Sequence, residues 1–350
     1  MDLDRFPRVA LARFPTPVED APRLAAAIGV DRLLIKRDDL TDLALGGNKV
    51  RKLEFLLGDT LAQSADTLIT TASAQSNFLR LTAAAARRLG MKPILIVRGC
   101  PDMPSRGNLL LMRLFEADIR YVETEDPFAE TTVRTMHAVA DEVRRRGGRP
   151  YLMHIATFSG GRAALGYVAA ALELAAQLKD RDLDPGHLVL AVGSGGTQAG
   201  LLLGLRLAGC RTRVLGVSVN IAAPVLRRMI AEHIRGAARL LQIAAPVRDN
   251  EIEVTDAHVG PGYGIPTPES LSAVHQGARE GLLFDPVYTG KAWAALAHAV
   301  RLGDIPRHAT VVFLHTGGAP NVFLHADALA GLAADTSTGA PAPTTPERRV

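Results

Sequence analysis

Short apolar runs rich in β-branched residues alternate along the chain with longer segments of helical apolar spacing. Six runs predict buried strands: 33–35, 67–70, 93–97, 188–192, 214–218 and 310–314. Apolar strands that alternate with amphipathic helices are typical of parallel sheets covered by helices on both faces. We therefore expect an α/β fold with mostly parallel, twisted sheets.

The intervening segments carry the spacing of helices that pack on a sheet. Apolar residues recur at i, i+3, i+4 and i+8 in segments 53–61 and 81–89, and Gly90 is placed to end the second helix. Ligands of parallel sheets bind in loops at the carboxyl ends of the strands. Polar, small-residue loops follow four of the runs, and there we expect the functional site: 36–52, 71–77, 193–200 and 315–321.

Composition narrows the class of protein. The chain has 350 residues, 47% hydrophobic and 22% charged, enough for one large or two medium domains. The net charge of +4 is small for this length. The densest basic block, 144–146, precedes Gly147-Gly148, so we interpret it as a solvated helix end. A nucleic-acid-binding surface would need more positive charge with interleaved aromatic residues.

Cysteine and histidine usage excludes disulfide scaffolds and zinc-ribbon proteins. The two cysteines, Cys100 and Cys210, form no Cys-x-x-Cys pair, and the ten histidines show no metal-ligand spacing. The N-terminus lacks the basic and apolar parts of a signal peptide, and no run of about 18 apolar residues occurs. We expect a cytoplasmic protein without a bound metal, nucleic acid or membrane.

The loop 193–200, GSGGTQAG, is a candidate phosphate site. Its glycines let backbone N–H groups converge, and a helix that begins near Thr197 would point its positive end at an anion. The loop lacks the Gly-Lys-Ser/Thr of a Walker motif, and Gln198 breaks the Gly-x-Gly-x-x-Gly pattern. A plain tight turn between a strand and a helix is the structural alternative.

Lys49 follows Gly46-Gly47 at a predicted helix start. A helix N-terminus repels cations, so this position and burial would lower the pKa of the amine. A neutral amine is what Schiff-base chemistry requires. The alternative is a solvent-facing lysine without a role.

Several further residues have both a structural and a functional interpretation. Ser76 or Asn77 can cap the helix that follows, and we favour capping from these residues alone. Tyr263 and Tyr288 lie in loops bounded by glycine, where they are loop anchors or acid–base groups. For His154 and His315 we favour a structural role.

Six separated segments agree in order and spacing with one enzyme family. They are 46–59 (GGNKVRKLEFLLGD), 75–77 (QSN), 193–201 (GSGGTQAGL), 261–266 (PGYGIP), 280–296 (EGLLFDPVYTGKAWAAL) and 315–320 (HTGGAP). With them the chain resembles, from about residue 6 to 325, the pyridoxal-phosphate (PLP) enzymes that include D-cysteine desulfhydrase and 1-aminocyclopropane-1-carboxylate deaminase. That family belongs to the tryptophan-synthase-β fold group, PLP fold type II.

The resemblance implies a role for each matching residue. Lys49 would be the Schiff-base lysine and the acid–base group at Cα, and Lys52 would lie near the cofactor phosphate. Asn77 would hydrogen-bond the ring hydroxyl, and Thr316 would face the pyridine nitrogen. The phosphate cradle would be Gly193, Ser194, Gly195, Gly196 and Thr197.

The resemblance also implies the substrate side of the site. Ser76, Tyr263 and Tyr288 would surround the substrate and act in catalysis. Thr289 and Thr316 match the desulfhydrase branch, because the deaminase branch has Glu and an apolar residue there. On this ground cyclopropane ring opening is disfavoured.

The sequence departs from the family where substrate contacts are expected. Phe78 replaces the histidine of Gln-Ser-Asn-His, the stretch 155–162 replaces Pro-x-Gly-Gly-Ser-Asn, and Thr267 replaces the asparagine of Val-Pro-Asn. Thr157 and Arg162 either form a different carboxylate or sulfonate site or repair local packing. The candidate substrate contacts are therefore Gln75, Ser76, Phe78, Thr157, Ser159 and Arg162.

Together these features predict a PLP-dependent lyase that performs α,β-elimination on a small amino acid, D-cysteine above others. Alternatives are a cysteate-type sulfo-lyase, an aminocyclopropane carboxylate deaminase, a β-replacement enzyme of secondary metabolism, a non-catalytic amino-acid or cofactor binder, and a Rossmann-type nucleotide binder. The expected architecture is two interleaved three-layer domains in a homodimer. Residues 1–52 and 166–333 would form the large cofactor-binding domain, 53–165 the small domain and 334–350 a disordered tail.

Overall fold

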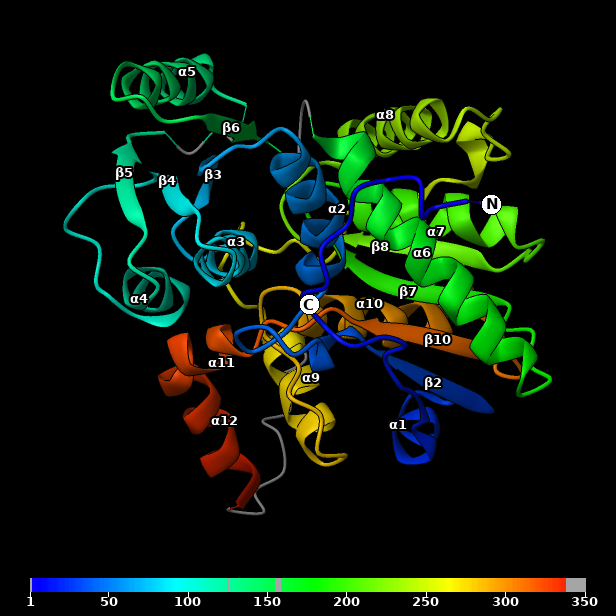
Figure 1. Cartoon of the computed structure of the whole chain (residues 1–350). Helices are drawn as coiled ribbons and strands as arrows, with labels where there is room; N and C mark the ends of the chain where they lie inside the picture. The colour runs from blue at the N-terminus through cyan, green and yellow to red at the C-terminus, as the bar shows by residue number, and fades with distance from the viewer. Residues whose placement is uncertain (1, 125, 127, 155–158, 338–350) are drawn as a thin grey trace.

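The computed structural model contains two separate sheets, each flanked by helices (Figure 1). The structure describes residues 2–124, 126, 128–154 and 159–337, and of the side chains at 332–337 nothing is stated. Strands and helices alternate along the chain, as expected of an α/β fold. The predicted fold class is confirmed.

The larger sheet has six strands and takes them from both ends of the chain. Only β1 runs antiparallel to its neighbour, β2. In spatial order the strands are β1 (Val18–Asp20), β2 (Arg32–Arg37), β10 (Thr310–His315), β7 (His187–Val192), β8 (Arg213–Ser218) and β9 (Glu253–Thr255).

Helices cover both faces of this sheet because its central strands are apolar on both faces. Leu34 and Val312 face a cluster that includes α6 (Gly160–Lys179), α7 (Gly196–Leu207) and α8 (Ala223–Leu241). Leu33 and Val311 face the opposite cluster. That second cluster includes α1 (Pro22–Ile28), α9 (Pro268–Ala278), α10 (Thr289–Leu302) and part of α12 (Ala326–Ser337).

The smaller sheet has four parallel strands, in the order β5 (Asp118–Val122), β4 (Lys92–Arg98), β3 (Thr67–Ser73) and β6 (Pro150–Met153). Leu68 and Leu95 face α2 (Lys49–Ala62), α3 (Asn77–Arg88) and α4 (Gly107–Leu114). Ile69 and Ile96 face α5 (Glu130–Arg145) on the other side. Gly147 follows α5 with φ 80°, so the basic block is the end of a helix, as expected.

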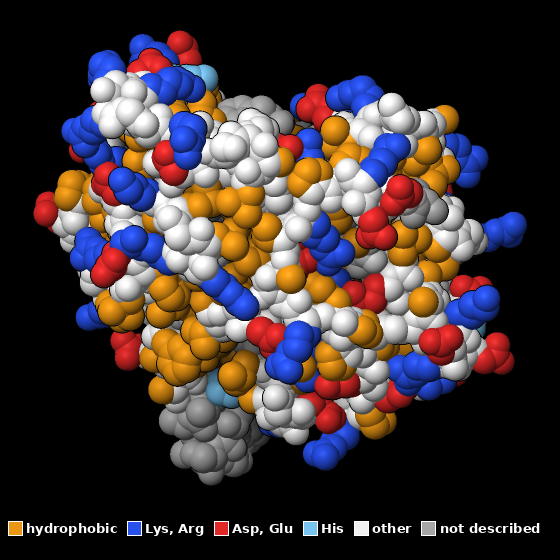
Figure 2. All heavy atoms as spheres, viewed as in Figure 1, with side chains coloured by type: hydrophobic (Ala, Val, Ile, Leu, Met, Phe, Trp, Pro, Cys, Tyr) orange, Lys and Arg blue, Asp and Glu red, His pale blue; other side chains and the backbone are white. Residues whose placement is uncertain are grey.

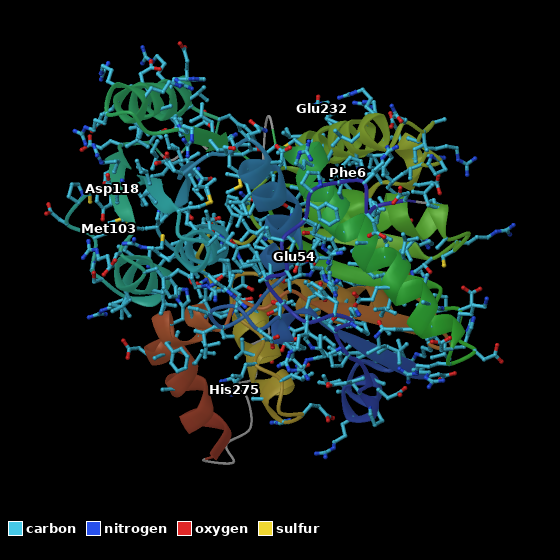
Figure 3. The ribbon with its side chains drawn as sticks, viewed as in Figure 1. Phe6, Glu54, Met103, Asp118, Glu232 and His275 are labelled. Carbon is cyan, nitrogen blue, oxygen red and sulfur yellow. The ribbon has the colours of Figure 1, made fainter. Side chains whose placement is uncertain are left out.

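Helix α2 lies between the two sheets (Figure 1). The N-terminal segment crosses it, and Glu54 on α2 accepts hydrogen bonds from the backbone of Leu11 and Ala12 (2.9 and 3.3 Å). Phe6 continues this segment toward the helices of the larger sheet (Figure 3). On the other side α2 packs against α6, and Gly166 lets the two backbones touch, since a Cβ there would lie 2.2 Å from the Arg51 carbonyl.

All strands of the smaller sheet fall inside the predicted small domain, and all strands of the larger sheet fall outside it. The predicted boundaries at 52/53 and 165/166 lie within α2 and α6, so they stay a prediction. The predicted disordered tail overlaps α12, which continues to Ser337, and its remaining residues, 338–350, lie outside the described part of the chain. The short elements η1 (Asp38–Leu40), η2 (Asp249–Glu251) and α11 (Pro320–Leu324) complete the fold.

Candidate active site

A cavity of about 570 Å³ opens where the carboxyl ends of strands from both sheets meet. The smaller sheet contributes the end of β3 and the start of α3, and the larger sheet contributes the loops after β7 and β10. Most of the predicted site residues line it: Lys49, Lys52, Ser76, Asn77, Phe78, Gly193, Ser194, Gly195, Thr197, Tyr263, Tyr288 and Thr316. Gly196 adjoins this cavity, since a Cβ on it would lie 3.4 Å from Lys52 Nζ.

Two glycine-containing loops in close contact place Lys49. The backbone N–H of Asn48 donates to the carbonyl of Thr316 (3.0 Å). A Cβ on Gly47, where φ is 125°, would lie 3.1 Å from that carbonyl, and a Cβ on Gly317 would lie 2.8 Å from the Gly47 Cα. Only glycine allows this approach, so the Gly-Gly pairs before Lys49 and after Thr316 bring the two residues into one site.

The amine of Lys49 is predisposed to lose its proton. Its Nζ donates to Asn48 Oδ1 (2.9 Å), and Asn48 Nδ2 donates in turn to Thr197 Oγ1 (3.1 Å). Burial and the nearby Arg80 charge lower the pKa of Lys49 to about 8, although Asp285 acts in the opposite direction. A substantial neutral fraction therefore exists near neutral pH, as nucleophilic and Schiff-base chemistry requires.

The cradle for an anion lies beside Lys49, on the same face of α2. The Lys52 side chain is 2% exposed, and no carboxylate in the described part of the chain pairs with it. Burial lowers the pKa of Lys52, and a bound anion would favour its charged form. Helix α7 starts at Gly196 without a side-chain cap, so its N–H groups point to the same place. A buried, unpaired ammonium at an uncapped helix start fits a phosphate group.

A second helix N-terminus, that of α3, faces the cavity. Ser76 is its N-cap, and its Oγ accepts from the N–H groups of Phe78 and Leu79 (3.2 and 3.4 Å). The favoured capping interpretation is thus correct, and the residue lines the cavity as well. Asn108 Nδ2 donates to Asn77 Oδ1 (2.9 Å), which fixes the orientation of the Asn77 amide.

A pair of tyrosine hydroxyls forms another part of the wall. Tyr263 Oη and Tyr288 Oη are 2.6 Å apart, and Ser73 Oγ donates to Tyr263 Oη (3.2 Å). Burial, with the Tyr263 hydroxyl beside it, raises the pKa of Tyr288, so its hydroxyl stays protonated. Buried Asp285 fixes the Tyr288 loop by accepting from the N–H groups of Tyr288 and Thr289 (3.0 and 2.9 Å).

Several residues of this region were not found in the sequence analysis. Arg51 fastens α2 to the larger sheet through Asp38 and Glu173 (2.9 Å each), and Arg80 donates to loop carbonyls before Lys49. Asn48 and Arg51 lie within the segment 46–59, so their position offered a signal that Arg80 lacked. The further cavity residues are Thr71, Arg98, Asp126, Phe128, His154, Asn220, Ile221 and Met229.

Three predicted substrate contacts, Gln75, Ser159 and Arg162, are not among the residues that line this cavity. Gln75 binds the start of α4, accepting from Asn108 N (2.9 Å). Arg162 pairs with Asp59 (3.0 Å), to which Tyr151 Oη also donates (2.8 Å). Arg162, Asp59, Tyr151 and Ser159 line a second cavity, of about 620 Å³. The fourth, Thr157, lies outside the described residues.

The two histidines differ in position. His315 is buried, packs its ring 5.1 Å from Phe284 and accepts from the N–H of Gly317 (3.3 Å), in line with a structural role. His154 lines the cavity, and burial lowers its pKa to about 4, so it is neutral at physiological pH.

The described residues contain no cluster of three or more potential metal ligands. Within the same residues, no helix has the length and apolarity to cross a membrane.

Comparisons with known proteins agree with this site. The family described as pyridoxal-phosphate dependent enzyme matches residues 9–317. D-cysteine desulfhydrase of Klebsiella pneumoniae (strain 342) is 39% identical over 331 residues, 93% of this chain and 98% of its own. A Pyrococcus abyssi protein with the provisional name 1-aminocyclopropane-1-carboxylate deaminase is 38% identical over 325 residues, 92% of this chain and 94% of its own.

Solved structures give the same result for the fold. The crystal structure of an ACC deaminase homologue superposes with a TM-score of 0.85 at 37% identity and covers 94% of this chain and 97% of that one. The processed form of threonine deaminase isoform 2 from Solanum lycopersicum superposes with a TM-score of 0.65 at 17% identity, covering 92% and 84%. The second likeness concerns the fold alone.

Proposed function

The chain belongs to the family of pyridoxal-phosphate-dependent enzymes, and from this premise we propose that it performs α,β-elimination on D-cysteine. It is a lyase of the group that contains relatives named deaminase and desulfhydrase, and its cofactor is pyridoxal phosphate. The proposed reaction converts cysteine and one water into pyruvate, hydrogen sulfide and ammonia. The observation that carries the proposal is the placement of the Lys49 amine and the Tyr263–Tyr288 hydroxyl pair on one cavity.

The described residues fit the cofactor at its reactive groups. Lys52 and the start of α7 would hold its phosphate, Asn77 its ring hydroxyl and Thr316 its pyridine nitrogen. When bound, pyridoxal phosphate supplies an aldehyde for an amine and a ring that takes up the electron pair left at Cα.

The chain itself supplies positioning and proton transfer. The start of α3 and the Ser76 hydroxyl would hold the substrate carboxylate, because a helix N-terminus with no acidic residue in its first turn attracts anions. The neutral Lys49 amine would accept the Cα proton. Tyr288, kept protonated and hydrogen-bonded to Tyr263, would donate to the departing sulfur.

The choice of D-cysteine rests on two supports. Relatives named D-cysteine desulfhydrase cover nearly the whole chain, and Thr289 and Thr316 match that branch. The structure adds that Thr289 Oγ1 donates to Asp285 (2.9 Å), so a glutamate at 289 would place a carboxylate beside that of Asp285.

A substrate panel tests the proposal. The purified enzyme with pyridoxal phosphate is assayed for keto acid with D- and L-cysteine, D- and L-cysteate, β-chloroalanine and aminocyclopropane carboxylate. We expect pyruvate and sulfide in equal amounts from D-cysteine, and loss of both in Lys49→Ala. If cysteate or aminocyclopropane carboxylate is turned over faster than D-cysteine, that compound is the substrate and the proposal of D-cysteine is wrong. No keto acid from any compound would support a non-catalytic binder.

We also propose a homodimer. Leu110 and Leu114 on α4 and Phe323 on the adjacent α11 are 42%, 66% and 73% exposed. Figure 2 shows apolar side chains gathered over this part of the surface. Light scattering should give the mass of two chains, and Phe323→Glu should lower it; the mass of one chain for the unmodified protein would contradict the proposal.

The exposed free thiol of Cys100 is compatible with the reducing cytoplasm as location.

A further inference from the structure

The loop that leads into Lys49 has an unusual backbone. Four consecutive residues, Ala44, Leu45, Gly46 and Gly47, have φ of 44°, 67°, 61° and 125°. The left-handed region is disfavoured for residues with a Cβ, so Ala44 and Leu45 need other contacts to stay there. Because Asn48 and Lys49 follow directly, any relaxation of this loop moves the amine.

Arg80 supplies those contacts from α3. Its Nη1 donates to the Ala44 carbonyl and its Nη2 to the Gly46 carbonyl (2.9 Å for the second). The planar guanidinium fork suits two acceptors held at a fixed spacing. Thr41 closes the same loop from within, since its Oγ1 accepts from Gly47 N (2.7 Å).

The charge of Arg80 is buried without an opposite charge. Its side chain is 0% exposed, Nε has no acceptor, and no carboxylate in the described part of the chain pairs with it. Burial lowers the pKa of Arg80 to about 10, so it remains protonated at neutral pH. A buried, uncompensated cation is costly, and a neutral side chain of similar size would avoid that cost.

We propose that Arg80 is a positioning residue for Lys49, which holds the left-handed loop and keeps a positive charge near the amine. The inference rests on the proposed function, in which this amine is the reactive group. Arg80 and Asp285 then act on the amine in opposite directions, the first favouring its neutral form and the second its charged form. Among the described residues, the other charged or titratable groups around the cavity are Lys52 on α2, Arg98 at the end of β4, Asp126, His154 after β6, and Tyr263 and Tyr288.

Competitive acetylation measures the amine directly. The cofactor-free full chain is labelled with acetic anhydride over a series of pH values, and mass spectrometry quantifies the Lys49 peptide. At pH 7 we expect Arg80→Gln to lower Lys49 labelling roughly threefold to tenfold, because its pKa rises and its neutral fraction falls in proportion. Arg87→Gln, an exposed arginine on the same helix, is the matched control and should match the wild type.

Three further variants separate the charge from general structural damage. Asp285→Asn should shift the Lys49 labelling curve to lower pH, opposite to Arg80→Gln, whereas unfolding would shift it to higher pH toward an ordinary lysine. Arg80→Met, which removes the charge with an apolar side chain of similar length, replaces Arg80→Gln if that variant does not fold. If both fail, Arg80→Lys should speed amide hydrogen exchange of residues 44–48, since a lysine cannot span two carbonyls.

An unchanged Lys49 profile in a folded neutral variant would overturn the inference, as would unchanged exchange in Arg80→Lys. These readouts need neither cofactor nor substrate. The inference can therefore fail while the proposed function stands, and the substrate panel can fail while this result stands.

Discussion

The hydroxyls of Tyr263 and Tyr288 form a 2.6 Å hydrogen bond inside the cavity wall, and Ser73 extends the chain of donors. Burial raises the pKa of Tyr288, so over the usual assay range its hydroxyl keeps its proton. Tyr263, by accepting or donating in this pair, orients the Tyr288 hydroxyl. We therefore propose that Tyr288 is the proton donor and that Tyr263 positions it.

Substitution of each tyrosine tests this division. Tyr288→Phe should lower kcat about 100-fold or more, the usual worth of a positioned proton donor, while Tyr263→Phe should have a smaller effect. The measurement is the initial rate of pyruvate formation with D-cysteine. Tyr151→Phe, at the second cavity, is the control and should retain the wild-type rate. Equal rates for Tyr288→Phe and this control would exclude the donor role.

At the residue scale, the sequence predicted those side chains whose signal is local. Lys49 stands in a Gly-Gly-Asn-Lys turn, and Ser76 directly precedes a helix, so neighbours along the chain identify them. Arg80 and Asp285 act on Lys49 from other elements, and nothing next to them in the sequence marks this. Arg162, predicted as a substrate contact, pairs with Asp59 at the second cavity, and its neighbours in the sequence do not indicate this partner.

At the element scale, the start of α7 and one residue of α2 together form the anion cradle. Lys52 Nζ would lie 3.4 Å from a Cβ on Gly196, so the glycine keeps the space between them open. In the proposed site, the phosphate of the cofactor would therefore have Lys52 and the start of α7 as partners.

Lys52→Met should distinguish the binding of the cofactor phosphate from the binding of its ring. We expect the affinity for pyridoxal phosphate to fall about 10- to 100-fold, since a charge-assisted hydrogen bond contributes about 1.5–3 kcal/mol. The affinity for pyridoxal, which lacks the phosphate, should change little. Fluorescence or absorbance titration of the cofactor-free protein measures both. An equal loss of affinity for pyridoxal phosphate and for pyridoxal would show that the phosphate does not bind at Lys52.

The elements that the sequence did not reveal share one property. The six predicted runs correspond to β2, β3, β4, β7, β8 and β10, while β1, β5, β6 and β9 were missed. These four are the edge strands of the two sheets. A central strand is buried on both faces and needs a continuous apolar run, whereas an edge strand is short and partly exposed, so its sequence lacks that run.

At the scale of the whole molecule, α2 and α6 connect the two sheets through close backbone contact. A Cβ on Gly166 would meet the Arg51 carbonyl at 2.2 Å, and one on Gly58 would meet the Pro7 carbonyl at the same distance. Backbone cannot give way as a flexible side chain can. Neither position therefore has room for a side chain in this arrangement of the helices.

Gly166→Ala should therefore destabilise the protein by about 1–3 kcal/mol, as overpacked interiors do, and lower its Tm by a few degrees. It should also weaken cofactor binding, because Lys52 lies on the displaced face of α2. Gly186→Ala, where a Cβ would meet nothing within 4 Å, is the control for thermal unfolding. Equal Tm values for the two variants would show that the helices accommodate the methyl group.

The central claim is that Lys49 is the amine that binds the cofactor. The most direct measurement is borohydride reduction of the protein with pyridoxal phosphate, followed by mass spectrometry of its peptides. We predict that the cofactor is fixed to Lys49 and that Lys49→Ala fixes none at that peptide. Fixation at Lys52 or at another lysine, or no fixation at all, would contradict the account.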